Sequence, residues 1–200
     1  AAAAIAEEFT PILGEAAIRR WQAPAGSAAR GEPQAPLRRM AEHIRAQAVA
    51  DAAPDAVLVP SVFEGWDCDA VATWPAELER PFTAAVLHDL IPLSMRELYL
   101  DGAWREAGLV PWYHRNLAEC AGLDLLLANS EATREEGLRH LRLPAQRVAV
   151  IHAGAEGRFH PVADPAPALA RLGLRPGYVL SLGLGDLRKN SHTLFAAYAA

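Results

Sequence analysis

The sequence has few cysteines, no long apolar run and no strong excess of charge. Its two cysteines, Cys68 and Cys120, are far apart, so they predict neither a disulfide framework nor a zinc site. Free thiols of this kind are typical of a reducing cytoplasm. No apolar run approaches the ~20 residues that a bilayer-spanning helix needs. The net charge of -5 argues against a general nucleic-acid binder, which requires clustered positive charge.

The two ends of the sequence also lack the usual signals. Residues 1–5 have neither the charged region nor the cleavage pattern of a signal peptide. Residues 194–200 stop inside a helical pattern that has no cap or breaker. From these ends we expect a segment of a longer protein, located in the cytoplasm.

The composition is that of a folded, soluble domain. Hydrophobic residues make up 52% and charged residues 22% of the 200 residues, enough for a substantial core in one large domain or one and a part. The early part is locally basic. A solvated face explains this basicity most simply, and contact with a charged acceptor or with anionic lipid at the inner face of a membrane is the alternative. The arginines concerned are Arg19, Arg20, Arg30, Arg38, Arg39 and Arg45.

Helical and strand patterns alternate along most of the chain. Apolar residues at helical spacing predict helices over 37–48 and 110–123, and Asn129 and Ser130 are placed to cap a third helix. Short continuous apolar runs predict buried strands, as in a parallel sheet covered on both faces. This rhythm predicts an α/β fold with a Rossmann-like, doubly wound parallel sheet. The predicted strands are 56–59, 82–87, 124–128 and 147–151.

The most informative stretch is Val86–Pro92. Its apolar run ends abruptly in His88 and Asp89 and is then broken by Pro92. In parallel α/β sheets ligands bind beyond the carboxyl ends of the strands, and a buried strand fixes the position of polar groups there. His88 and Asp89 are therefore candidate site residues. The alternative is an ordinary histidine at the start of a loop.

The last fifty residues have a different character. A proline-rich stretch without amphipathic period predicts a linker, and the apolar run 178–182 predicts another strand. The loop Gly183–Asn190 then opens a helix. Glycines allow close backbone approach, helix amides attract an anion, and Arg188 with Lys189 can neutralise a diphosphate.

Five motifs occur in a characteristic order along the chain. They are Val86–Pro92, Trp112–Leu117, Asn129–Arg134, Gly154–Pro161 and Asp186–Asn190. Together they resemble the bacterial group 1 glycosyltransferases, the family 4 retaining enzymes of the GT-B fold. Members of this kind build O-antigen, capsule or exopolysaccharide glycans, often as mannosyl- or rhamnosyl-type transferases.

The resemblance implies two Rossmann-like domains with the active site between them. Residues 1–158 would be the acceptor-side domain, incomplete at its start, 159–176 a linker, and 177–200 the first β-α unit of the donor-binding domain. Such enzymes transfer a sugar from a UDP-, GDP- or dTDP-linked donor to a glycan or lipid-linked acceptor. They usually need no metal or other cofactor, because cationic side chains and helix dipoles stabilise the leaving group.

The resemblance also implies roles for single residues. His88 would lie near the donor sugar as a catalytic residue, and Asp89 would shape that turn or contact the acceptor. On the loop 60–69, Phe63 and Trp66 are able to stack on an acceptor sugar and Glu64 to contact it, although packing under the loop is the alternative. The donor-binding candidates are Gly183, Gly185, Arg188, Lys189, Asn190 and Ser130.

Three departures from the family pattern limit the resemblance. The opening strand and glycine-rich loop do not precede Ala1, and the paired-glutamate motif would lie beyond Ala200. The loop at Leu184 lacks an arginine that many relatives have. We therefore expect the 200 residues alone to be inactive. A non-catalytic sugar-nucleotide or glycan-binding module is the alternative function, and a sugar-nucleotide epimerase a weaker one.

An acidic Asp67-Cys68-Asp69 triplet matches the metal-binding Asp-x-Asp of the other major glycosyltransferase fold. A metal site there would need oxygen ligands converging beside substrate phosphates. The histidines show no paired metal-ligand spacing. We interpret the triplet as a solvated acidic turn and predict no metal site.

Overall fold

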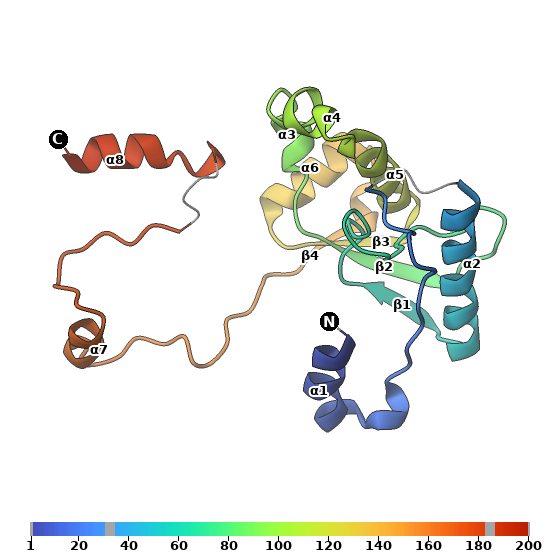
Figure 1. The fold of residues 1–200 in the computed structure, drawn as a ribbon, viewed down its shortest axis with the longest axis horizontal. Helices are drawn as coiled ribbons and strands as arrows, with labels where there is room; N and C mark the ends of the chain where they lie inside the picture. The colour runs from blue at the N-terminus through green and yellow to red at the C-terminus, as the bar shows by residue number, and fades with distance from the viewer. Residues whose placement is uncertain (1, 31–34, 183–186, 200) are drawn as a thin grey trace. The chain divides into compact units, whose positions relative to one another are not determined.

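The protein is described by a computed structural model, which covers residues 2–30, 35–182 and 187–199 (Figure 1). The chain divides into two compact units, residues 1–153 and 154–200. Each unit is described by itself below. Within the described ranges, no helix is both long enough and apolar enough to cross a membrane.

The centre of the first unit is a parallel four-stranded sheet with the order β1-β2-β3-β4. The register pairs Leu87 with Ala128 and Ala128 with Val150, so the carboxyl ends of β2, β3 and β4 lie at one edge. The predicted α/β architecture and its four strands in this unit are confirmed. The strands are β1 (Ala56–Val59), β2 (Phe82–Leu87), β3 (Leu125–Ala128) and β4 (Val148–Val150).

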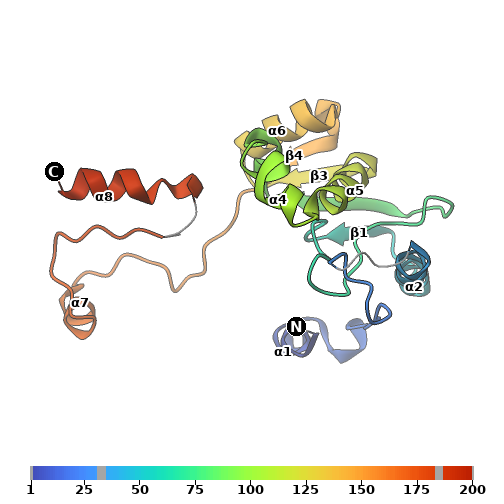
Figure 2. The same ribbon diagram turned by 45° about the horizontal axis from the view of Figure 1, so that its top comes forward.

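Helices cover one face of this sheet. In both views α5 (Leu109–Gly122) and α6 (Glu131–Leu141) lie on the same side of it (Figures 1 and 2). The buried core joins Leu87 and Leu126 of the strands to Leu117 and Cys120 of α5. The predicted helices are confirmed, including α2 (Ala35–Ala52). The remaining helices among the described residues of this unit are α1 (Ala2–Leu13), α3 (Ile91–Ser94) and α4 (Trp104–Glu106), with a π-helical turn over Tyr99–Ala103 and 3-10 turns over Glu15–Ala17 and Ala145–Arg147.

The expectation of strands buried on both faces is wrong for the described residues. Burial alternates along β2 and β3, and β1 is only partly buried, with Leu58 58% exposed. The physical reason is position, since β1 is an edge strand and the core helices α5 and α6 lie on a single face. The strand order also runs without reversal in the described part of the chain, so a doubly wound topology stays a prediction.

The connection from β1 to β2, residues 60–81, contains no helix. Polar contacts hold it to α5 and to α2. Arg80 forms an ion pair of 2.7 Å with Glu119 on α5, and both side chains are largely buried. Thr73 Oγ1 donates to Glu42 Oε1 on α2 at 2.6 Å. These contacts hold the loop after β1 against α5, which places aromatic residues of the loop beside that helix.

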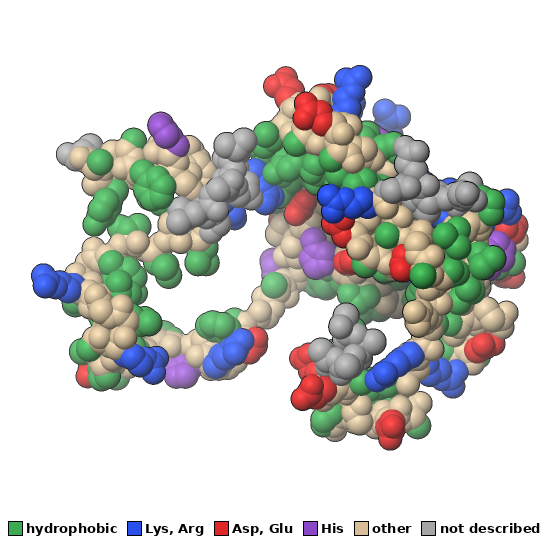
Figure 3. Space-filling view, viewed as in Figure 1, with side chains coloured by type: hydrophobic (Ala, Val, Ile, Leu, Met, Phe, Trp, Pro, Cys, Tyr) green, Lys and Arg blue, Asp and Glu red, His purple; other side chains and the backbone are tan. Residues whose placement is uncertain are grey.

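The second unit contains α7 (Ala166–Arg171), a 3-10 turn at Leu187–Lys189 and α8 (Ser191–Ala199). The predicted strand 178–182 is wrong: these residues form no strand, and Leu180 and Leu182 are 74% and 79% exposed. A parallel strand is held by hydrogen bonds to a neighbour, and the second unit offers no partner strand among its described residues. Hydrophobic side chains are consequently visible on its surface (Figure 3).

Candidate functional site

A cavity of about 200 Å³ lies at the carboxyl end of β2. It combines the loop after β1, the turn after β2 and side chains from α4 and α5. Its volume is below the ~300 Å³ that marks the lower end of complete ligand pockets, so it suits a ring-sized group better than a whole nucleotide sugar. The lining residues are Ser61, Phe63, His88, Asp89, Pro92, Trp104, Trp112 and Tyr113.

His88 is oriented by the backbone of the neighbouring loop. Its Nε2 atom lies 3.0 Å from the carbonyl oxygen of Pro60. Because a carbonyl only accepts, Nε2 carries the hydrogen and donates it. In the neutral imidazole Nδ1 is then a hydrogen-bond acceptor, so the exposed ring can accept a hydrogen bond from a hydroxyl group.

Asp89 shapes the turn that follows. Its Oδ1 accepts a hydrogen bond of 3.1 Å from the backbone N–H of Ile91, two residues on, in an Asx-type turn at the start of α3. The side chain remains exposed, so its second carboxylate oxygen is available to solvent or a ligand. The predicted turn-shaping contact is therefore present, and the acceptor contact stays a prediction.

Tyr113 contributes a buried hydroxyl with no hydrogen-bond partner in the described structure. Burial, with a smaller effect of the Asp89 charge, raises the pKa of Tyr113 above its ordinary value. The group therefore stays protonated and remains a potential donor. Buried polar groups are nearly always paired, so an unpaired one at a cavity indicates a position for a ligand oxygen or a water.

Aromatic rings form one wall of the cavity. Phe63 stacks on Tyr113 with ring centroids 5.1 Å apart, and Trp104 meets Tyr113 edge-on at 5.3 Å. Trp112 is fixed by a hydrogen bond of 3.0 Å from Nε1 to the carbonyl of Glu64. Flat apolar surfaces beside a few polar groups match the C–H faces and hydroxyls of a sugar.

The amino terminus of α6 is tied to the same turn. Ser130 caps the helix, since its Oγ accepts from the backbone N–H of Thr133 at 3.2 Å. The Thr133 hydroxyl, which is buried, lies 3.3 Å from the His88 carbonyl and 2.9 Å from Asn129 Oδ1. Ser130 thus performs the predicted capping, and its predicted role in donor binding stays a prediction.

Of the three acceptor-side candidates, only Phe63 lines the cavity at the end of β2. Phe63 lines the cavity with His88 and Asp89, whereas Trp66 packs on Trp112 with ring centroids 5.9 Å apart. Glu64 borders a second, smaller cavity. Sequence reasoning did not assign Trp104 or Tyr113 to the site. Tyr113 lies within the motif Trp112–Leu117, and this motif was the sequence feature that could have identified it as a site residue.

The predicted donor residues belong to the second unit. Arg188 and Lys189 end the 3-10 turn, and Asn190 precedes α8 with a positive φ of 47°. All three side chains are exposed. Gly183 and Gly185 lie outside the described residues. The donor-binding role of this segment stays a prediction.

Both aspartates of the acidic triplet contact residues of the segment 28–30. Asp67 pairs with Arg30 at 2.8 Å, and Asp69 Oδ1 accepts from the backbone N–H of Ala28 at 2.9 Å. In the ranges that the structure describes, no three His, Cys, Asp or Glu side chains are grouped so as to hold a metal ion.

Comparison with known proteins shows similarity to glycosyltransferases. Serotype-specific mannosyltransferases WbdA from Escherichia coli are 32% identical to the chain over 164 residues, which is 80% of the chain and 19–20% of these relatives. A D-inositol 3-phosphate glycosyltransferase from Streptomyces bingchenggensis is 39% identical over 66 residues, 32% of the chain and 14% of that protein. No family model and no solved structure matches. The chain thus spans about one fifth of the length of the mannosyltransferases it resembles.

Proposed function

We propose that this chain is the acceptor-side domain, with the start of the donor-binding domain, of a retaining GT-B glycosyltransferase of the group 1 type. The whole enzyme transfers a hexose from a nucleotide diphosphate sugar to a glycan or a lipid-linked acceptor, in cell-surface polysaccharide biosynthesis at the cytoplasmic side of the membrane. The observation that carries the proposal is the cavity at the end of β2, where His88 and Asp89 meet the rings of Phe63, Trp104 and Tyr113. The similarity to mannosyltransferases supports a mannose-type sugar.

In this proposal the cavity orients the reacting sugars. Nδ1 of His88 accepts a hydroxyl hydrogen, the Tyr113 hydroxyl donates to a sugar oxygen, and the aromatic wall packs against ring C–H groups. The fixed contact of His88 with the Pro60 carbonyl limits the positions that the imidazole can take. Positioning of this kind contributes to the rate because the entropy of orienting the reactants is lost before the chemical step.

The leaving nucleotide diphosphate is assigned to the second unit. Arg188 and Lys189 stabilise its developing charge together with the amino-terminal amides of α8, and no metal ion is needed for that step. Asn190 and the glycines at 183 and 185 complete the donor loop. The rest of the donor site lies on parts of the enzyme outside these 200 residues.

A glycan-binding module without turnover is the second candidate. The aromatic wall and the unpaired Tyr113 hydroxyl favour it, because they are sufficient for sugar binding without any chemistry. The two functions differ in one respect that is easily measured, the release of nucleotide diphosphate.

The test is nucleotide diphosphate release by the full-length protein, with a panel of UDP-, GDP- and dTDP-sugars and mannose-containing acceptors. We expect release with one donor class and at least a tenfold loss in His88→Ala, about 1.4 kcal/mol of transition-state stabilisation. His114→Ala, at an exposed position of α5, is the matched control and should keep its activity. Sugar binding without release from any donor would favour the binding module. Full activity of His88→Ala would contradict the assigned site.

A further inference from the structure

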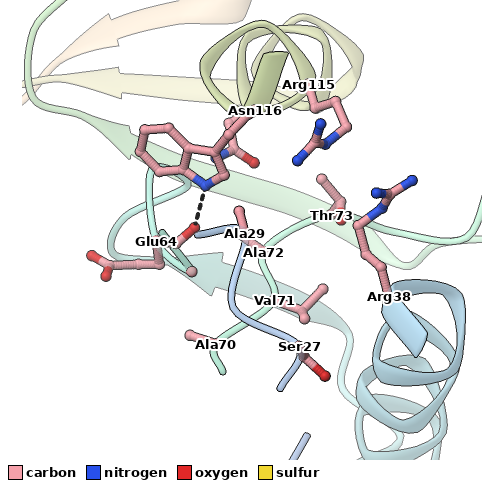
Figure 4. Close-up of a pocket in the computed structure, with 12 residues that line it drawn as sticks. Ser27, Ala29, Arg38, Glu64, Ala70, Val71, Ala72, Thr73, Arg115 and Asn116 are labelled. Carbon is pink, nitrogen blue, oxygen red and sulfur yellow. Dashed lines mark hydrogen bonds between the residues drawn. The ribbon is translucent and has the colours of Figure 1, made fainter. Parts of the chain in front are cut away.

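A second, smaller cavity borders Trp112 and is built around two arginines (Figure 4). Arg38 comes from α2, Arg115 from α5, and Thr73 from the loop that precedes β2. The volume is about 30 Å³. A water needs at least ~10–15 Å³ by this measure, so the cavity admits roughly two oxygen-sized groups and not a whole nucleotide.

In Figure 4 the Arg38 side chain extends from α2 toward the side of the cavity where Arg115 lies. Arg115 makes no hydrogen bond or ion pair with any described residue, and Arg38 has an ion pair with Glu42 at the long distance of 3.8 Å. Burial, followed by the repulsion of Arg38 and opposed by Glu42, lowers the pKa of Arg115. Arg115 therefore carries a guanidinium charge without an ion-pair partner among the described residues, and an added anion would stabilise that charge.

Asn116 supplies a further donor. The residue is only 4% exposed, it lines the cavity, and its Nδ2 atom is buried without a hydrogen-bond partner. Figure 4 shows its side chain next to Arg115. An unpaired buried donor destabilises the fold, and an oxygen atom placed in the cavity would remove that cost.

The remaining polar groups of the cavity are directed elsewhere. The Glu64 carboxylate extends away from the arginines in Figure 4, and the Glu64 carbonyl accepts from Trp112 Nε1. The Ser27 hydroxyl donates to the Pro24 carbonyl at 2.7 Å, and the Thr73 hydroxyl donates to Glu42. The Glu42 carboxylate therefore already accepts from Thr73 and pairs with Arg38, and the unpaired donors belong to Arg115 and Asn116.

We propose that Arg38, Arg115 and Asn116 form a binding site for a phosphate-type oxyanion. Guanidinium groups bind phosphate through paired N–H···O bonds, and the small volume admits its oxygen atoms while the rest of the ligand stays outside. The site shares only Trp112 with the lining of the cavity that contains His88, and it does not depend on the proposed transferase activity.

The test is a titration of the full chain with inorganic phosphate, at ionic strength held constant with sodium chloride, followed by calorimetry and thermal unfolding. We expect saturable binding and a rise in the unfolding midpoint. Arg115→Gln should weaken binding by about tenfold or more, since it removes a charge-assisted hydrogen bond. Arg105→Gln, at an exposed arginine of α4, is the matched control and should bind normally.

A second variant tests the site by adding a negative charge to it. Asn116→Asp places a carboxylate beside both arginines, so it should raise the unfolding midpoint without phosphate and abolish the response to phosphate. This outcome separates anion binding from simple damage to the fold.

Two further arms identify the source of the phosphate group. The probes are glycerol phosphate, and phosphatidylcholine vesicles with and without phosphatidylglycerol. Arg115-dependent binding to the anionic vesicles assigns a lipid headgroup, and Arg115-dependent binding to glycerol phosphate alone assigns a soluble ester. A phosphate response no larger than that of chloride, or one of equal size in Arg115→Gln, would overturn the proposal.

Discussion

At the residue scale, the polar groups of the β2 cavity differ in how they are held. His88 is fixed through the Pro60 carbonyl, and Asp89 through the backbone N–H of Ile91. The Tyr113 hydroxyl has no partner in the described residues. A group that is satisfied in the free protein stabilises the fold, whereas an unsatisfied one destabilises it and becomes useful when a ligand binds. The Tyr113 hydroxyl should therefore lower the stability of the free protein and strengthen the binding of a ligand.

The substitution Tyr113→Phe tests both effects of the hydroxyl, on stability and on binding. Removing a hydroxyl that has no partner should leave the free energy of unfolding unchanged or raise it by up to ~1 kcal/mol. The same variant should bind sugar more weakly. Urea unfolding followed by tryptophan fluorescence gives the stability, with Tyr99→Phe as the control in the adjacent turn. A loss of more than ~1 kcal/mol in Tyr113→Phe would mean that the hydroxyl is already hydrogen-bonded.

Cys120 provides a prediction about pH. The thiol is 1% exposed, and burial, with a smaller effect of the Glu119 charge, raises its pKa to about 12 from the ordinary 9.0. As the pH rises, the unfolded chain therefore loses this proton before the folded chain does. The contribution of Cys120 to the free energy of unfolding is fully present below pH 9 and is lost as the pH rises toward 12.

Unfolding midpoints across this range should fall less steeply in Cys120→Ala than in the wild type. Cys68→Ala, at the exposed cysteine, should follow the wild type. Parallel curves for the two variants would show that Cys120 does not titrate between the folded and unfolded states as described.

At the element scale, α6 connects the sheet to the site. Its first turn binds the His88 carbonyl through Thr133, and its middle packs closely on the strands. A Cβ added at Gly137 would lie 3.1 Å from Leu87 Cδ2 and 3.9 Å from Val148 Cγ1. Glycine at this position therefore sets the distance between the helix and the sheet, and with it the position of the turn after β2.

Gly137→Val should destabilise the fold by about 1–3 kcal/mol, because the added methyl groups meet Leu87 in the core. Ala132→Val, on the exposed face of the same helix, should cost only about 0.5 kcal/mol through helix propensity. Denaturant unfolding of the two variants measures the difference. Equal losses would show that α6 does not pack on Leu87 as closely as described.

Sequence patterns predicted the elements that depend on local signals. The run 82–87 was identifiable as a strand from its apolar residues and its abrupt polar end, and Ser130 as a cap from its place before a helical pattern. The run 178–182 has equally strong apolar character but forms no strand. Strand formation depends on a neighbouring strand, which a local pattern does not reveal.

The composition of the site was only partly predictable for a related reason. His88, Asp89 and Phe63 follow strand ends, where the topology of a parallel sheet brings residues together. Trp104 reaches the cavity through an irregular segment that includes the π-helical turn and the non-helical Gly102. No periodic pattern indicates where such a segment returns to the sheet.

At the scale of the whole molecule, the two units have different surfaces. The first unit buries a continuous core, whereas the second exposes large apolar side chains, including Leu182 and Tyr198. The chain corresponds to about one fifth of the mannosyltransferases that it resembles. Sugar recognition is therefore proposed for the first unit, which contains a lined cavity among its described residues.

Tryptophan indole signals test this assignment most directly. The chain has five tryptophans, of which Trp104 and Trp112 line the cavity and Trp21, Trp66 and Trp74 do not. In a nitrogen–proton correlation spectrum titrated with a mannose oligosaccharide, we predict that the signals of Trp104 and Trp112 shift saturably. The signals of Trp21 and Trp74 should stay in place, and His88→Ala should weaken the response. Shifts confined to Trp21 or Trp74, or no shift at any sugar concentration, would contradict the claim that the cavity at the end of β2 is the carbohydrate site.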